Sequence, residues 1–264
     1  IGIVSTLLIW VAASGAKTHD VCIDASIKKT KEKTTGKDIS VLFKTKPLLL
    51  LIVAFGLSFL ANTLLNSANM YYFKYVLHKE NWIPTVMFVT MSASILASMV
   101  LTKLEAKFGK RNLFMYTSIL CAIPLFIIGF MPTMGMVGLS VLLVVFGFFY
   151  GFVSALPWAM VPDCIDFAQW KYGVQPNGLF TATFTFIQKC ATAIGGFLSG
   201  ILLGFAGFIA NQEQSAQALQ MIINLRFFIP AVLFVLTILA LYFYEITPKK
   251  TKEIAAELEK RNNN

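Results

Sequence analysis

The chain has 264 residues, of which 57% are hydrophobic and only 13% are charged, and its formal net charge is +9. Soluble domains carry about 25% charged residues, so this chain has too little polar surface to cover a compact body in water. Its apolar residues form runs of about 20, the length that crosses about 30 Å of hydrocarbon as a helix. The composition excludes an ordinary soluble domain and predicts an integral membrane protein.

The chain begins inside an apolar run, from Ile1 to about Ser14. This run has no charged segment before it and no cleavage site, so it does not read as a signal peptide. We expect residues 1–14 to be the remnant of a spanning helix, the sixth of a longer protein. Residues 15–46 are long, basic and rich in threonine, and we expect them to form a cytoplasmic loop between two halves of that protein.

Six complete spanning helices are predicted within residues 47–246, and no strand is expected. They cover Pro47–Val76, Pro84–Thr102, Leu113–Met131, Gly135–Val161, Gly178–Ala210 and Leu225–Tyr244. The remaining residues, 247–264, form a tail in which Thr247 and Pro248 resemble a helix N-cap followed by a proline at the first helical position. A short amphipathic helix is predicted there, at the cytoplasmic surface.

Most of the 22 basic residues lie in alternate connections, namely residues 17–46, residues 103–111, Lys171 and the tail, whereas Lys74, Lys79 and Arg226 lie on the other side. By the positive-inside rule these connections are cytoplasmic. The net charge then reflects topology and is not expected to bind nucleic acid. The four cysteines include no Cys-x-x-Cys pair, and the two histidines lie on opposite sides of the membrane, so neither a disulfide framework nor a metal site is predicted.

A polar stripe marks the first complete span, where Ser58, Asn62, Asn66 and Asn69 recur on one face. Such side chains either form hydrogen bonds between helices or contact a ligand. Further along, Asp163 and Asp166 lie three residues apart at the predicted cytoplasmic end of the fourth span. They are either solvated charges at a helix end or part of a gate.

Lys189 is the only charge that these predicted spans place deep inside the membrane. A lysine at mid-bilayer costs at least about 3 kcal/mol, so it should face a protein partner or a wet cavity. Thr181, Thr185 and Thr192 lie on the same helix face. No Asp or Glu lies deep in the predicted spans, so a carboxylate partner would come from outside this chain. A structural ion pair remains the alternative to a functional role. Gly196, Gly200 and Gly204 continue roughly the same face and predict a close-packed seam.

Several segments resemble one transporter family. The connection Lys103-Leu-Glu-Ala-Lys-Phe-Gly-Lys-Arg111, in which a tight turn is expected at Gly109, resembles a degenerate loop signature of the major facilitator superfamily. The stretch from Ala155 to Gly207, which contains Pro-Trp-Ala-Met-Val-Pro-Asp163-Cys-Ile-Asp166, closely resembles the glycoside–pentoside–hexuronide:cation symporters. Segments 69–77 and 213–219 also resemble that family. The resemblance implies the C-terminal six-helix half of a twelve-helix major facilitator fold, together with the end of helix six.

The resemblance also implies a function, which is sugar or glycoside symport driven by Na⁺ or H⁺ through alternating access. Lys189, with Thr181, Thr185, Thr192 and Asn66, is then expected to couple substrate and cation, and Asp163 and Asp166 to form a cytoplasmic gate. Trp158, Tyr150 and Phe184 are candidates for stacking on a sugar ring. The chain departs from the family at Gln169, Gln175 and Asn177, where Glu, Arg and Glu are common. Amides keep hydrogen bonds but not ion pairs.

The expected partners are a sugar, a coupling cation, the absent N-terminal half and the lipid bilayer, and no cofactor is expected besides the cation. The expected location is the cell membrane, specifically a bacterial inner membrane. One alternative is a lipid or amphiphile transporter of the same fold. A membrane enzyme or sensor is a second alternative, but we find no nucleophile with a base, no His/acid pair and no metal-ligand spacing that would support it.

Overall fold

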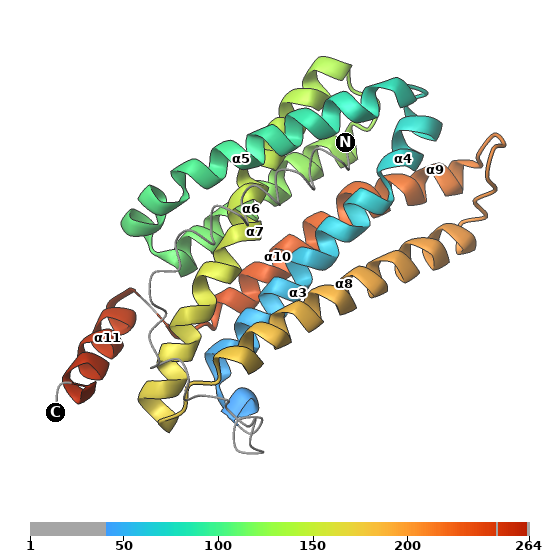
Figure 1. The fold of residues 1–264 in the computed structure, drawn as a ribbon. Coiled ribbons are helices and arrows are strands. Elements are labelled where there is room, and N and C mark those ends of the chain that lie inside the picture. Colours follow the sequence, from blue (N-terminus) through green and yellow to red (C-terminus); the bar gives the residue numbers. More distant parts are fainter. Residues whose placement is uncertain (1–40, 247, 263–264) are drawn as a thin grey trace, which may run out of the picture. The chain divides into compact units, whose positions relative to one another are not determined.

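The computed structural model of the chain describes residues 41–246 and 248–262, and the regular elements in these ranges are all helical (Figure 1). Six of them are long and apolar enough to cross a membrane: Lys46–Val76, Glu80–Phe108, Lys110–Phe130, Met136–Tyr172, Asn177–Phe205 and Ala216–Tyr242. The predicted all-α class and the six spans are confirmed. The predictions for residues 1–14 and for the loop up to residue 40 lie outside the described residues.

The first and last spans are composite and each contains a π turn. The first consists of α3 (Lys46–Ser67), α4 (Asn69–Tyr71) and the π turn η2 (Tyr72–Val76). The last consists of α9 (Ala216–Ile223), the π turn η4 (Asn224–Phe228) and α10 (Ile229–Tyr242). π turns are rare inside helices and are frequent at functional sites. These two meet, since the rings of Tyr72 and Phe227 lie 4.9 Å apart between centroids.

The four middle helices are regular. A 3₁₀ turn, η3 (Glu80–Trp82), leads into α5 (Ile83–Phe108), and α6 (Lys110–Phe130), α7 (Met136–Tyr172) and α8 (Asn177–Phe205) follow. Gly109 separates α5 from α6 with φ at 76°, which a residue with a Cβ rarely adopts. The tight turn predicted at this glycine is confirmed.

Four predicted helix ends are wrong by several residues. α5 ends at Phe108 rather than Thr102. α7 continues through Pro157 and Pro162 to Tyr172, whereas the predicted helix ends at Val161. Prolines are tolerated inside spanning helices because neighbouring groups satisfy the freed backbone. α8 ends at Phe205 rather than Ala210. The last span begins at Ala216 rather than Leu225, and the side chain of Ser215 caps it by accepting a hydrogen bond from Ala218 N at 3.2 Å.

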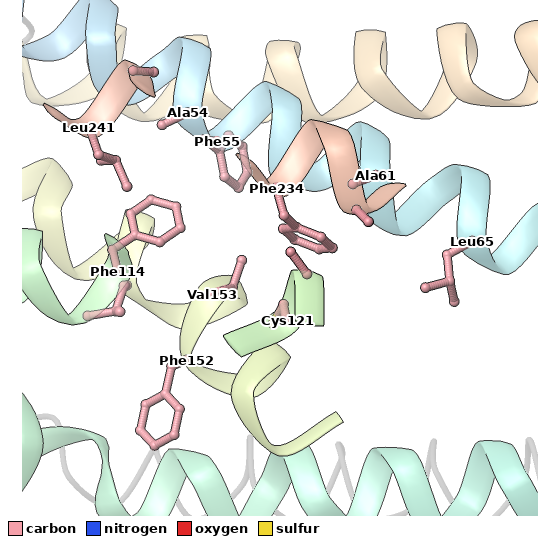
Figure 2. Packing of buried hydrophobic residues seen from close by; sticks show 14 of the residues in the cluster. Ala54, Phe55, Ala61, Leu65, Phe114, Cys121, Phe152, Val153, Phe234 and Leu241 are labelled. Carbon is pink, nitrogen blue, oxygen red and sulfur yellow. The ribbon is translucent and has the colours of Figure 1, made fainter. Parts of the chain in front are cut away.

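The core lies among α3, α6, α7 and α10. Figure 2 shows buried side chains of these four helices, with Phe234 of α10 between Ala61 of α3 and Cys121 of α6. α5 packs against α7, and α8 packs against α3. These two helices are the least covered of the six spans. In the most apolar stretch of each span, 17% of the residues are buried in α5 and 22% in α8, against 50% in the first and last spans. α5 and α8 are therefore the spans with the smallest buried share among the six.

Glycines set the close approach of α7 to α5. A Cβ added at Gly151 would lie 2.6 Å from Ser94 O, and one at Gly147 would lie 2.6 Å from Thr90 O. The Ser94 hydroxyl donates to Gly147 O at 2.7 Å. The two backbones can approach this closely only because both α7 positions lack a side chain.

The glycine seam predicted on α8 is not packed in this structure. Cβ atoms added at Gly196, Gly200 or Gly204 would meet nothing within 4 Å. The glycine of α8 that packs is Gly195, where an added Cβ would lie 2.7 Å from Thr63 Cγ2 of α3. The predicted glycine seam is therefore wrong for contacts among the described helices. Its three glycines lie on the face of α8 that no described helix covers.

The tail forms the predicted helix, α11 (Pro248–Asn262). Its Ile254 is buried, and the indole Nε1 of Trp170, near the end of α7, donates to a carboxylate oxygen of Glu257. α11 thus packs on the α7 end that is predicted to be cytoplasmic.

Candidate functional site

Lys189 lies near the middle of α8, about 18 Å along the helix from Asn177. It is exposed, as are Thr181, Thr185 and Thr192 on the same face. The three threonine hydroxyls donate to carbonyls one turn back, at 3.0 Å, 3.2 Å and 2.9 Å. No carboxylate of residues 41–246 or 248–262 forms an ion pair with Lys189. The lysine and its threonines therefore lie on a helix face that this half of the molecule leaves uncovered.

The asparagine stripe of the first span lines a cavity of about 430 Å³. Asn66 is exposed, and its Nδ2 donates to Asn62 O at 2.9 Å and to Asn62 Oδ1 at 3.0 Å. Asn69 is buried, and its Oδ1 has no hydrogen-bond partner. Ser58 is also buried but donates to Phe55 O in its own helix. The amides, but not the serine, therefore face the cavity.

The cavity is formed by five elements: α3, the adjoining α4, α5, α7 and η4. Its walls are mostly apolar, with a few polar groups, and its lining consists of Asn62, Leu65, Asn66, Asn69, Val86, Met87, Thr90, Met91, Ser94, Ile95, Leu143, Phe146, Tyr150 and Arg226. Its volume and mixed lining are typical of small-molecule sites, which occupy about 300–1,000 Å³. Lys189 is not among the lining residues.

Arg226 is a charge that the sequence prediction misplaced. The predicted last span begins at Leu225, which places Arg226 at the extracytoplasmic end of that span. The helix in fact begins at Ala216, so Arg226 lies about 15 Å inside it and is only 2% exposed. Lys189 is therefore not the only charge deep in a span. The Ser215 cap and the apolar spacing after it are the signals that would have corrected this prediction.

The three predicted aromatic residues fall into two places. Tyr150 lines the cavity, with its ring stacked on Phe146 at 5.7 Å between centroids. Trp158 is 40% exposed and lies 6.0 Å from Phe184, and both rings contact Phe55 of α3. Phe184 itself is fully buried, which leaves no ring face for a ligand. The expectation of a stacking role for Phe184 is corrected, while Trp158 and Tyr150 keep accessible surface.

The two aspartates predicted to form a gate have different surroundings. The Asp163 carboxylate pairs with Lys110 Nζ at 2.8 Å, and that ammonium also donates to Ala159 O at 2.9 Å. Asp163 is thus paired within its own half in this structure, and its role in a cytoplasmic gate stays a prediction. Both aspartates lie inside α7, not at its end. Asp166 is half-buried and shows no ion pair among the described residues.

Two of the amides that replace the family's charges contact each other. Gln175 Nε2 donates to Gln169 Oε1 at 2.6 Å. Glu and Arg are common at these two positions in the family that the sequence resembles. In this chain the two positions form a neutral hydrogen bond, where a Glu and an Arg could form an ion pair.

The structure brings together Asn66 and Tyr150 in the cavity, and Trp158 and Phe184 in the aromatic cluster. It places Lys189 and its threonines on a separate face of α8, and Asp163 beside the α5–α6 turn. The candidate site is therefore a set of neighbouring surfaces on α3, α5, α7 and α8, of which the cavity is the concave part.

The chain is similar to proteins of known class. The model of the family described as MFS/sugar transport protein matches residues 1–248. The protein named "Putative sulfoquinovose importer" in Escherichia coli (strain K12) is 31% identical over 86% of this chain and 49% of its own length. The isoprimeverose transporter of Lactiplantibacillus pentosus is 32% identical over 75% of this chain and 41% of its own length. The glucuronide carrier protein homolog of Escherichia coli (strain K12) is 24% identical over 96% of this chain and 56% of its own length. The chain thus spans about half the length of the curated relatives that it matches.

Proposed function

Since the chain belongs to the MFS/sugar transport protein family, among the glycoside–pentoside–hexuronide:cation symporters of the major facilitator superfamily, we propose that it is the C-terminal half of a cation-coupled sugar transporter. Residues 1–14 are then the end of helix six, residues 15–46 the cytoplasmic loop between halves, residues 47–246 the six-helix domain, and residues 247–264 a cytoplasmic tail. The substrate lies between the two halves, and each half rocks against the other to expose it alternately.

The observation that carries this proposal is the position of Lys189. A cation near the middle of a spanning helix is costly unless it has a partner, and the described residues supply no carboxylate for it. Its helix face is uncovered and carries three threonine hydroxyls. We propose that carboxylates of the other half lie opposite it and bind the coupling Na⁺ or H⁺. Lys189 then links their occupancy to the conformation of the transporter.

The cavity on α3 supports a sugar as the cargo. A sugar offers many hydroxyl groups, and the amides of Asn62, Asn66 and Asn69 supply directional donors and acceptors for them. The isoprimeverose transporter and the glucuronide carrier homolog are named for sugars. A lipid transporter would need an apolar path without such amides, so the lining favours the sugar over the amphiphile alternative.

A gate around Asp166 in the last turns of α7 completes the proposed cycle. Asp166 has no ion-pair partner among the described residues, so it can pair with a basic residue of the other half when the cytoplasmic side closes. Gln169, Gln175 and Asn177 contribute hydrogen bonds rather than ion pairs. The protein then resides in the cell membrane, specifically a bacterial inner membrane, and catalyses no covalent chemistry.

The test is Lys189→Ala in the full-length transporter that contains this chain. We expect loss of gradient-driven accumulation of radiolabelled sugar in membrane vesicles, with the variant present at normal level. Lys79→Ala is the matched control, because Lys79 is an exposed lysine in the turn before η3. Undiminished accumulation by Lys189→Ala would contradict the proposed role.

A competition assay separates the two cargo classes. Unlabelled sugars should inhibit uptake and lysolipids should not. Inhibition by lysolipids alone would instead favour the amphiphile transporter.

A further inference from the structure

Arg226 is a buried cation without a charged partner among the described residues. It lies in the π turn η4 and is 2% exposed. No Asp or Glu of residues 41–246 or 248–262 pairs with it. Its one hydrogen bond in these ranges is long, from Nη1 to Leu65 O at 3.4 Å, and its Nε is buried with no acceptor. The guanidinium therefore retains donors that nothing in the described part of the chain satisfies.

Three aromatic rings surround the same guanidinium. Its Cζ lies 5.1 Å from the ring centre of Tyr72, 5.4 Å from that of Phe73 and 5.2 Å from that of Phe227. Rings at this distance stabilise a cation through their electron-rich faces. They accept no strong hydrogen bonds, so they hold the group in place without using its N–H donors. Arg226 is thus fixed and charged, with a planar fork of donors that fits a two-oxygen anion.

The two π turns explain this placement. Tyr72 and Phe73 belong to η2, while Arg226 and Phe227 belong to η4. A π turn shifts the side chains that follow it around the helix axis relative to a regular α-helix. Here the two turns lie against each other, so that one supplies two rings of the cage and the other supplies the cation and the third ring.

Arg226 also lines the cavity of about 430 Å³, together with Asn62, Asn66, Asn69 and Tyr150. Asn69, whose buried Oδ1 has no hydrogen-bond partner, belongs to the same lining. One wall thus offers a cationic donor and another offers an acceptor that lacks a donor. A molecule that complements both carries an anionic group and hydroxyl groups.

We propose that this cavity binds an acidic sugar, with a carboxylate or sulfonate on Arg226 and hydroxyls on the asparagine amides. The proposal rests on the proposed sugar transport and specifies its substrate class. Two alternative roles of Arg226 predict a different result. If Arg226 serves packing alone or pairs with a carboxylate of the other half, its loss affects neutral and acidic sugars equally.

The experiment uses the full-length transporter and four probes: methyl β-glucuronide, a 6-sulfonated hexoside, methyl β-glucoside and a neutral xyloside. Initial uptake rates and thermal stabilisation by each probe are measured for the native protein, Arg226→Gln, Arg226→Lys and Lys79→Gln. Lys79→Gln removes an exposed positive charge and leaves the cavity untouched. Comparing the carboxylated with the sulfonated probe shows which anion the Arg226 guanidinium prefers.

We expect the native protein to transport and bind an acidic probe. Arg226→Gln should lower the initial uptake rate of that probe at least about tenfold, since a buried charge pair loses one partner. The uptake rates of the neutral probes should stay at the level of the native protein. Arg226→Lys should raise the KM for the acidic probe while neutral probes keep theirs, because the ammonium lacks the planar fork. Lys79→Gln should behave as the native protein does.

Equal loss of acidic and neutral uptake in Arg226→Gln would overturn the proposal, as would a native protein that binds only neutral probes. If Arg226→Gln does not accumulate in the membrane, Arg226→Lys and the native binding profile decide. A native protein that transports no probe contradicts sugar transport, but stabilisation by the acidic probes alone would still support the anion site.

Discussion

At the residue scale, Lys110 joins three helices. It begins α6, pairs with Asp163 of α7 at 2.8 Å and lies 3.7 Å from Glu105 of α5. Its bond to Ala159 O supplies a donor to the turn of α7 that precedes Pro162. Both partners of the shorter pair are largely shielded, with 26% and 12% of their side chains exposed, so solvent screens the pair less than a surface ion pair.

Asp163→Asn should therefore destabilise the six-helix domain by about 1–3 kcal/mol, the range for hydrogen bonds to charged groups. The Lys110 ammonium would lose its closer charged partner and keep Glu105 at 3.7 Å and the neutral carbonyl of Ala159. The measurement is the thermal unfolding temperature of the purified full-length transporter in detergent.

Glu105→Gln is the control, because Glu105 lies farther from the same ammonium and should change the temperature little. A double-mutant cycle with Lys110→Gln should show that the two positions are coupled. Independent effects of the two changes would mean that the ion pair contributes nothing.

The contact between Gln169 and Gln175 gives a second prediction at this scale. Gln169→Glu together with Gln175→Arg should keep transport near the native rate, because an ion pair replaces the hydrogen bond. Gln169→Glu alone should slow transport, since it leaves an added negative charge near Asp166 without the arginine. Initial uptake rates of the single and double variants check this, and equal rates for both would argue against any role of the pair.

At the scale of helices, the close packing of α5 on α7 depends on two glycines. The nearest atoms to an added Cβ at Gly151 are the backbone carbonyl of Ser94 and the Cβ of Ala97, at 2.6 Å and 2.8 Å. A backbone carbonyl cannot rotate away as a flexible side chain can. Any side chain here must separate the helices or bend one of them.

Gly151→Ala should cost about 1–3 kcal/mol by overpacking, although alanine is the better helix former by about 1 kcal/mol. Thermal unfolding of the full-length transporter measures the difference. Gly138→Ala in the same helix is the matched control, because its added Cβ would meet only Met134 Sδ at 3.6 Å. A Gly151 variant as stable as the Gly138 variant would show that the helices separate at little cost.

At the scale of the whole molecule, the least covered helices are α5 and α8. α8 exposes Phe186 and Phe197 at 65% and 67% in addition to Lys189. Lipid can cover apolar side chains, but it cannot satisfy Lys189. The uncovered face is therefore consistent with contact between two halves of a larger transporter.

Residues 1–264 expressed alone should insert into the membrane and fail to accumulate sugar in a transporter-deficient strain. The reason is that half of the proposed site is missing. Co-expression with the preceding half should restore accumulation, provided that both pieces reach the membrane. Accumulation by residues 1–264 alone would show that the site does not lie between halves.

The class, the number of spans and the family followed from the sequence by itself. Apolar runs of membrane length have few alternatives in water or lipid, and the Pro-Trp and Asp163-to-Asp166 motifs are local in the chain. Lys189 was found in the same way, since a charge in a long apolar run is visible without coordinates. The tight turn at Gly109 also depends only on local backbone conformation.

The tertiary structure decided which polar groups meet. Lys110 and Asp163 are far apart in the chain, and no periodicity links them. The depth of Arg226 in the membrane could be found only from the true start of the last helix. That start depends on one cap at Ser215 and not on hydropathy. Its aromatic cage and its cavity join η2, η4, α3, α5 and α7. Contacts of this kind arise from packing between distant segments, and the sequence contains them only through the fold.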